Sequence, residues 1–136
     1  MKILDANTFA AKEDLLELIG RIKTVDRTPD ELEYWLRSNL ATDVFGAWVA
    51  QDDDGELAGM VTCELVWNQF KPLCFIPFTW IDGKADIGLE LMAKVEEWAR
   101  ERELDKIQMY TRRKPSAFER KYGFKIERIV MSKEIG

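Results

Sequence analysis

The chain has 136 residues and a net charge of −5, and its side chains are 46% apolar and 11% aromatic. This length and apolar content predict one globular domain over residues 1–136 and exclude a disordered chain. No apolar run reaches the roughly 20 residues of a membrane span, and MKILDANTF lacks a signal-peptide pattern, so we expect a cytoplasmic protein. The absence of histidine excludes Ser-His and Cys-His nucleophiles and argues against a zinc site.

Charge is unevenly distributed along the chain. Residues 1–68 carry 6 basic and 14 acidic side chains, whereas residues 69–136 carry 14 basic and 11 acidic ones. An acidic protein is not expected to bind nucleic acid specifically. The basic segment 106–136 suits a small phosphorylated ligand, although solubilising surface charge is the alternative interpretation for any one residue.

The first quarter of the chain predicts a strand at residues 2–5 and then two helices. Asn7 or Thr8 can cap the first helix, in which apolar residues recur at helical spacing over 10–23. Thr28 is expected to cap the second helix, with Pro29 in its first turn and Glu31 in position for a capping box.

The middle of the chain predicts strands at residues 45–51, 57–67 and 73–81. Three aspartates and a glycine at 52–55 favour a hairpin turn over a calcium loop, which needs about twelve residues and a terminal glutamate. Cys63 and Cys74 lie in the second and third of these strands. We expect both to be buried and reduced, and to lie opposite each other if the chain turns near residues 68–69.

The remainder predicts a loop at 82–85, a long amphipathic helix, a strand at 106–110, a short helix at 116–121 and a last strand at 125–132. The helix carries one apolar stripe, formed by Ile87, Leu91, Val95, Trp98 and Ala99. The element order is therefore β-α-α-β-β-β-α-β-α-β. This order indicates a mixed α/β (α+β) fold with an antiparallel front half and a βαβ unit behind it.

The segment 75–124 resembles a known family. The stretch FIPFTWIDGKADIGLELMAKVEEWARERELDKI reads as strand, loop, helix and strand, and SAFERKYGFK reads as a short helix that ends in Gly-Phe. Together they resemble the two signature regions of the GNAT superfamily of N-acetyltransferases, and the element order extends the resemblance over most of the chain. The resemblance implies a GNAT-like fold, acetyl-CoA as co-substrate and no metal.

The resemblance also implies a place for the acyl-CoA. In the family, the strand before the long helix pairs with the pantetheine arm, and the loop that follows wraps the pyrophosphate with backbone N–H groups at the helix N-terminus. Gly88 stands where a family glycine is expected, whereas Asp86 replaces the first glycine and is a natural helix cap. The predicted cofactor-binding residues are Trp80, Ile81, Gly83, Lys84, Ala85, Ile87, Gly88 and Arg112.

Two residues are candidates for proton transfer. The family tyrosine that protonates the departing thiolate aligns with Glu119. Tyr122, one turn later, is our candidate donor, and Tyr110 is a possible substitute; a packing role is the more usual interpretation for each tyrosine. Glu64 is our candidate base, because apolar neighbours would raise the pKa of its carboxyl. A solvent-exposed Glu64 is equally compatible with the sequence, and Asp82, in a turn, is expected to face solvent.

Aromatic residues concentrate on the strands at 57–67 and 73–81. They are Trp67, Phe70, Phe75, Phe78 and Trp80. Core, acceptor pocket and dimer surface are all open interpretations, with core expected for most. Trp67 and Phe70 flank the expected turn and are the better candidates for contact with a substrate or a second copy in a homodimer.

The sequence thus favours an N-acyltransferase in which a small-molecule or peptide amine attacks acetyl-CoA directly, without a nucleic-acid or membrane partner. A catalytically degenerate binding or interaction protein of the same fold is the main alternative. A nucleotide or phosphate module that uses Lys84, Arg112 and Arg113 is the third.

Overall fold

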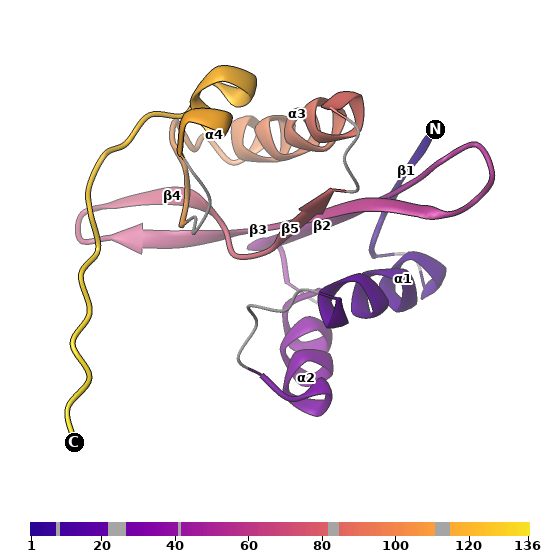
Figure 1. The fold of residues 1–136 in the computed structure, drawn as a ribbon, viewed down its shortest axis with the longest axis horizontal. Coiled ribbons are helices and arrows are strands. Elements are labelled where there is room, and N and C mark those ends of the chain that lie inside the picture. The colour runs from indigo at the N-terminus through magenta and orange to yellow at the C-terminus, as the bar shows by residue number, and fades with distance from the viewer. Residues whose placement is uncertain (8, 22–26, 41, 82–84, 111–114) are drawn as a thin grey trace.

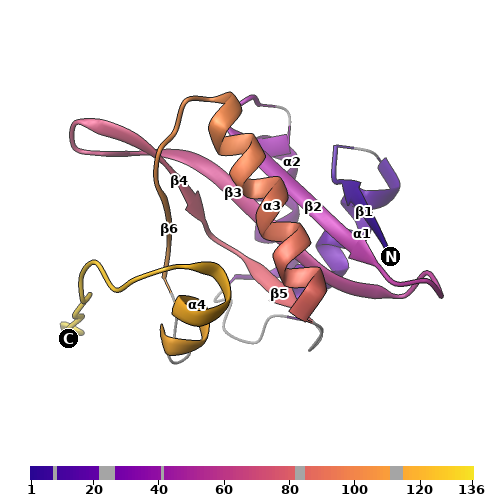
Figure 2. The same ribbon diagram turned by 90° about the horizontal axis from the view of Figure 1, so that it is seen from above.

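The computed structural model describes residues 1–7, 9–21, 27–40, 42–81, 85–110 and 115–136. Its elements in chain order are β1 (Lys2–Asp5), α1 (Phe9–Gly20), α2 (Pro29–Leu40), β2 (Phe45–Gln51), β3 (Leu57–Asn68), β4 (Lys71–Ile76), β5 (Thr79–Ile81), α3 (Ala85–Glu101), β6 (Ile107–Met109) and α4 (Pro115–Tyr122). Helices α1 and α2 cover one face of a central sheet, and α3 and α4 cover the other (Figures 1 and 2).

The sheet has the order β1-β2-β3-β4-β6, and β5 pairs with β3 beside this path. All strand pairs are antiparallel except β4 with β6, which are parallel and joined through α3. This arrangement confirms the mixed α/β class with an antiparallel front half and a βαβ unit behind it.

Strand β3 separates two hydrophobic cores, because successive side chains of a strand point to opposite faces. Val61 and Cys63 belong to the core that lies under α3. Met60 belongs to the core beneath α1 and α2, with Leu15 and Leu36. The two faces of the sheet are therefore packed independently of each other.

Local sequence signals in the first half give the expected structure. The Thr28 hydroxyl accepts a hydrogen bond from the Glu31 N–H at 3.2 Å, so the predicted helix cap is confirmed. At the β2–β3 turn, the carboxylate of Asp52 accepts from the N–H groups of Asp54 and Glu56, both at 2.9 Å. Gly55 has a φ of +80°, which favours glycine, so the hairpin interpretation of this turn is confirmed.

The single strand predicted at 73–81 is wrong, because the chain breaks there into β4 and β5. Pro77 has no N–H to donate to a sheet and interrupts the ladder. The carbonyl of the next residue, Phe78, accepts from the N–H of Thr62 at 2.9 Å, so the chain stays beside β3 across the break. Strand β3 consequently pairs with β4 along Glu64–Asn68 and with β5 along Gly59–Val61.

The strand predicted at 125–132 is also wrong. Residues 123–136 form neither helix nor strand in the structure. The alternation of residues that suggested a strand is a local property, whereas a strand also needs a neighbouring backbone with which to pair.

The two cysteines are buried and free, as expected. The β3–β4 register pairs Cys74 with Leu65, so Cys63 and Cys74 are diagonal neighbours and the prediction that they lie opposite each other is wrong. Burial, reinforced by the adjacent Cys74, raises the pKa of the Cys63 thiol, which therefore remains protonated. In the described part of the chain no helix is both long and apolar enough to cross a bilayer.

Candidate active site

The sheet opens at one place, beside β5. Strands β4 and β6 pair in register from Cys74 with Ile107 to Ile76 with Met109. Beyond that point β5 continues along β3 but pairs with no second strand among the described residues. The backbone groups on the edge of β5 that faces away from β3 are thus available to an extended ligand.

Helix α3 begins at Ala85, four residues after the end of β5. The first-turn N–H groups of a helix have no partner within the helix and carry the positive end of its dipole, which favours an anionic group. The Ile87 side chain is buried in the core, so only its backbone could contact a ligand. Asp86 lies inside the first turn rather than at the predicted cap, while Gly83, Lys84 and Arg112 lie outside the described residues.

Gly88 is required by the approach of α4. A Cβ atom built at Gly88 would overlap the hydroxyl oxygen of Tyr122 and lie 3.0 Å from the Cδ1 of Ile81. A side chain at this position would therefore push α4 away from α3. Close packing explains the glycine, in addition to any role in phosphate binding.

Tyr122 is the last residue of α4 and is half-buried beside the first turn of α3. Its ring lies 6.2 Å from that of Phe118, centroid to centroid. Burial raises the pKa of its phenol, so the side chain is a neutral hydrogen-bond donor at neutral pH. The structure thus brings together three predicted site residues, Ile81, Gly88 and Tyr122.

Glu64 lies on the other face of the sheet. It alternates along β3 with Cys63 and shares the face of Met60, on which α1 and α2 pack. Its cross-strand neighbours are Phe45 on β2 and Phe75 on β4. The carboxyl is half-buried beside these residues, and this desolvation raises its pKa, which is one of the two environments that the sequence left open.

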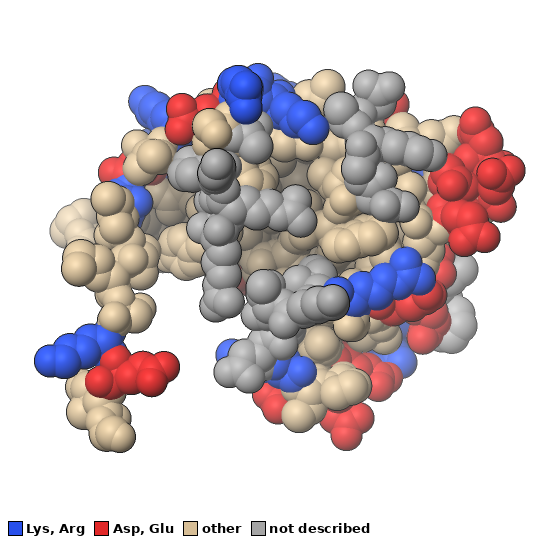
Figure 3. Space-filling view, viewed as in Figure 1, with Lys and Arg blue, Asp and Glu red and all other residues tan. Residues whose placement is uncertain are grey.

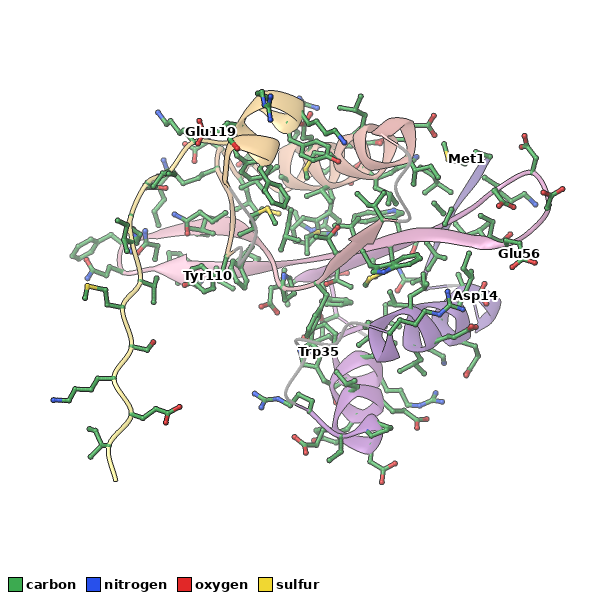
Figure 4. All side chains as sticks on the ribbon, viewed as in Figure 1. Met1, Asp14, Trp35, Glu56, Tyr110 and Glu119 are labelled. Atoms are coloured by element: carbon green, nitrogen blue, oxygen red, sulfur yellow. The ribbon has the colours of Figure 1, made fainter. Side chains whose placement is uncertain are left out.

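Aromatic pairs flank Glu64 on both sides. Trp35 of α2 makes edge-on contacts with Phe45 and Phe78, at centroid distances of 5.3 and 5.1 Å. Phe75 makes a similar contact with Tyr110, at 5.0 Å. Figure 4 shows Trp35 and Tyr110 on the same side of the sheet. These rings form an apolar surface around one carboxylate, which suits a cationic amine.

Two of these aromatic residues were not predicted as site residues. Trp35 packs against the core beneath α1 and α2, and its ring also reaches the sheet. Tyr110 was considered only as a substitute proton donor, and it is exposed at the end of β6. Trp80, a predicted cofactor contact, packs its side chain into the core beneath α1 and α2, so only its backbone lies on the ladder edge.

The two predicted proton-transfer residues therefore occupy opposite faces of the sheet. Glu64 lies on the α1–α2 face, and Tyr122 lies on the α3–α4 face. A reacting centre between the two groups therefore requires an opening in the sheet, such as the one beside β5. Glu119, which takes the place of the family tyrosine, is exposed on α4 (Figure 4).

Other parts of the molecule offer less chemistry. A hollow of about 470 Å³ lies between the start of β2 and the C-terminal half of α3, and none of the predicted site residues lines it. Within the residues that the structure describes, no group of three or more His, Cys, Asp or Glu side chains could hold a metal ion.

An open βαβ unit with a helix N-terminus beside an unpaired strand edge is the architecture of an acyl-CoA-binding N-acyltransferase domain. The profile of the Acetyltransferase (GNAT) family matches residues 12–124. Because this match spans most of the sequence, the chain belongs to the GNAT acetyltransferase family. A search among curated proteins finds no significant match.

Solved structures share the fold at low sequence identity. The aminoglycoside antibiotic 6'-N-acetyltransferase of Acinetobacter haemolyticus is 18% identical, with a TM-score of 0.79 over 100% of both chains. A second aminoglycoside 6'-N-acetyltransferase, in complex with a bisubstrate analogue that contains CoA, is 14% identical, with a TM-score of 0.81 over 99% of this chain and 98% of that one. Glucosamine-6-phosphate N-acetyltransferase of Arabidopsis thaliana is 15% identical, with a TM-score of 0.74 over 99% and 98%.

Proposed function

We propose that this protein transfers an acetyl group from acetyl-CoA to the amine of a small molecule. The observation that supports this most strongly is the opening of the sheet after Ile76 and Met109, with the N-terminus of α3 close behind it. An unpaired strand edge suits the amide-containing pantetheine arm, and a helix N-terminus suits the pyrophosphate.

Glu64 is the proposed base. A protonated amine must lose a proton before it can attack the thioester carbon, and a carboxylate with a raised pKa can accept it directly or through a water molecule. A backbone N–H on the free edge of β5 polarises the thioester oxygen as negative charge develops there. The nitrogen–carbon bond forms and the carbon–sulfur bond breaks without a covalent enzyme intermediate.

Tyr122 is the proposed donor to the leaving thiolate. Its phenol is neutral and lies beside the start of α3, on the face opposite Glu64. A proton is thus accepted on one side of the reacting centre and donated on the other.

The aromatic surface around Glu64 favours an amine of a small molecule over a bulky partner. One carboxylate among Trp35, Phe45, Phe75 and Tyr110 attracts a cation and gives it apolar walls. The fold neighbours that act on aminoglycosides and on glucosamine-6-phosphate make amino sugars the first class to test.

Calorimetric titration with CoA and a thiol-release assay with acetyl-CoA test the proposal. We expect micromolar to millimolar CoA binding, and thiol release that depends on an added amine. Amino sugars, aliphatic diamines and a lysine-containing peptide separate the acceptor classes. No binding heat at millimolar CoA would overturn the proposal.

A binding protein of the same fold without catalysis is the second candidate, and Asp86 in the first turn of α3 favours it. A carboxylate there places a negative charge where the pyrophosphate is expected. Substitution Asp86→Gly separates the two candidates. If the wild type fails to bind CoA and the variant binds it, the degenerate protein is supported; equal binding by both supports the enzyme.

A further inference from the structure

A hollow on the α3 side of the sheet takes no part in the proposed reaction. It has a volume of about 470 Å³ and lies between the start of β2 and the C-terminal half of α3. This end of α3 points away from β5, so the hollow is separate from the candidate active site (Figure 2). Volumes of roughly 300–1,000 Å³ are typical of small-molecule sites. The hollow is therefore large enough for a small ligand.

Two tryptophans that are otherwise buried line this hollow. Trp48 of β2 is 9% exposed and Trp98 of α3 is 6% exposed. They meet at Gly46, where a Cβ atom would lie 2.7 Å from the ring of Trp48 and 2.9 Å from the Nε1 of Trp98. A Cβ atom at such distances would overlap both side chains, so the two rings need glycine at this position. The rings and the glycine backbone form the inner wall of the hollow.

The indole N–H of Trp98 has no acceptor among the residues that the structure describes. In the same part of the chain, every side-chain nitrogen or oxygen that is sealed from solvent does have a hydrogen-bond partner. The Nε1 atom therefore still reaches solvent, and the hollow that Trp98 lines is its route. A donor that is nearly buried is poorly hydrated, so a ligand oxygen that accepts this hydrogen bond is favoured.

Arg102 holds the walls of the hollow in place. Its Nε donates to the carbonyl oxygen of Asp43 at 2.8 Å, and one terminal nitrogen donates to that of Trp98 at 3.1 Å. Its guanidinium also lies 4.1 Å from the centroid of the Trp98 ring. Arg102 thus joins the end of α3 to the segment before β2 and covers one face of the indole. The site is formed before a ligand arrives, which lowers the cost of binding.

Carboxylates outnumber cations around the hollow. Its charged residues are Asp5, Asp43, Lys94, Glu97, Glu101 and Arg102. The guanidinium of Arg102 is already shared between two carbonyl groups and the carboxylate of Glu101, 3.7 Å away. The carboxylates of Asp43 and Glu97 make no ion pair within the described residues, and only the exposed Lys94 remains among these six to balance them. The net negative charge favours a cationic ligand.

We propose that the hollow is a second binding site, for a small organic cation that also carries a hydrogen-bond acceptor, as amino sugars and amino alcohols do. The ammonium group lies near the carboxylates of Asp43 and Glu97, and a ligand oxygen accepts from the Nε1 of Trp98. The carbon skeleton packs on the ring of Trp48. The site binds its ligand without acetyl-CoA, so it does not rest on the proposed transfer reaction.

Another part of the surface is more acidic but has no such walls. Figure 3 shows acidic side chains gathered at the end of the molecule where the β2–β3 hairpin lies. Asp54 and Glu56 in this hairpin are exposed. A cation held by charge alone would gather there, whereas a ligand that fits the hollow would not. The hairpin therefore provides a control for unspecific attraction.

NMR of the isotope-labelled protein during titration with glucosamine tests the proposal. The chain has five tryptophans, so five indole N–H signals report on five places, and the signal that is lost in Trp98→Phe is that of Trp98. We expect millimolar glucosamine to move this signal. Glucose has the same ring without the charge, and putrescine has the charge without an oxygen. Each should bind at least about fivefold more weakly than glucosamine.

Two exposed carboxylates of the hollow can be neutralised without disturbing the fold. The double variant Asp43→Asn and Glu97→Gln should bind glucosamine about five- to tenfold more weakly, with unchanged circular dichroism. The hairpin control Asp54→Asn should bind it normally. In Trp98→Phe, where the signal of Trp48 reports binding, loss of the N–H donor should weaken binding about fivefold.

Binding near Glu64 is a separate event that the same spectra distinguish. Trp35 lies on the other face of the sheet, so its signal reports an amine that binds there. The response of Trp98 should persist in Glu64→Gln. The proposal is overturned if glucose moves the Trp98 signal as strongly as glucosamine does, if the double variant binds normally, or if glucosamine leaves the Trp98 signal in place. None of these outcomes depends on whether the protein transfers acetyl groups.

Discussion

The two faces of the sheet are built for different tasks. On the α3–α4 face, Gly88 allows Tyr122 to contact the first turn of α3, so two helices and the end of β5 form one close-packed corner. On the α1–α2 face, Glu64 is half-buried between phenylalanine rings. One face thus offers backbone donors to an anion, and the other offers a single carboxylate to a cation.

This difference matters because acyl transfer to an amine needs both environments at one bond. In the proposed mechanism, acetyl-CoA enters the opening beside β5 with its phosphates near the helix N-terminus and its thioester near the level of the sheet, and the amine arrives from the opposite side. The predictions below test whether the two faces act as separate parts of one site.

The largest effect is expected from Glu64→Gln. If Glu64 is the base, kcat/KM should fall by about 100-fold or more, because general bases contribute roughly 10² to 10⁴ in rate. Activity of the wild type should also decrease as pH falls through the raised pKa of Glu64, since only the carboxylate accepts a proton. The chain has no histidine whose titration could produce the same decrease in activity.

A matched control for this variant is Glu56→Gln, which removes an exposed carboxylate from the β2–β3 hairpin. It should leave the rate and its pH profile unchanged. CoA affinity should be the same in both variants, because in the proposed mechanism CoA binds beside the start of α3, on the face opposite Glu64. A Glu64→Gln enzyme of normal rate would show that another group accepts the proton.

A smaller effect is expected from Gly88→Ala. Its methyl group would meet the Tyr122 hydroxyl and Ile81, so we expect a loss of about 1–3 kcal/mol in unfolding free energy, reduced by the better helix propensity of alanine. Adding Tyr122→Phe should restore part of the loss, which urea denaturation measures.

Gly20→Ala is the control for that substitution, because no atom lies within 4 Å of a Cβ built there. It should not destabilise the protein. If Gly88→Ala is equally harmless, the corner between α3 and α4 is looser than described, and the requirement for glycine must come from the ligand.

The smallest effect is expected in the unfolding free energy of Glu64→Gln, compared with that of the wild type. Because the folded pKa of Glu64 is raised above its ordinary value of 4.5, the unfolded chain releases this proton at lower pH than the folded one. Glu64 therefore lowers stability as pH rises from about that value through the folded pKa. The glutamine variant should gain less than about 1 kcal/mol at pH 7, since the group is half exposed, and nothing below pH 4.

Thermal melts of both proteins at pH 4 and pH 7 measure this difference. A variant that is more stable but less active is the pattern expected where a residue serves function at the expense of stability. If the wild type and Glu64→Gln are equally stable at pH 4 and also at pH 7, the carboxyl is more fully hydrated than its neighbours suggest.

Sequence signals predicted the fold where they act over a few residues. The Thr28 cap, the aspartate turn and the bounds of β2 all follow from neighbouring residues and were correct. The break at Pro77 was missed although the proline was visible, because the apolar run on both sides favoured one long strand. The strand predicted at 125–132 was wrong because a strand needs a neighbouring backbone, and a short stretch of sequence does not show whether one is present.

The candidate site divides in the same way. Apolar neighbours along its own strand left a buried and an exposed Glu64 equally open, and the strand register decides between them by placing Glu64 between Phe45 and Phe75. The contact between Tyr122 and Gly88 joins residues 34 positions apart, so no spacing rule could give it. The separation of Glu64 and Tyr122 onto opposite faces required the strand register, which only the structure supplies.

The break at Pro77 has a consequence for how the protein can be observed. Strand β4 is paired on both sides, whereas within the described residues three-residue β5 is paired only with β3. Short, one-sided elements open locally at low free energy, so amide protons of β5 should exchange with solvent faster than those of β4. A ligand that pairs with the free edge would slow exchange most at the β5 amides that point away from β3, so these amides report occupancy of the site without any assay of turnover.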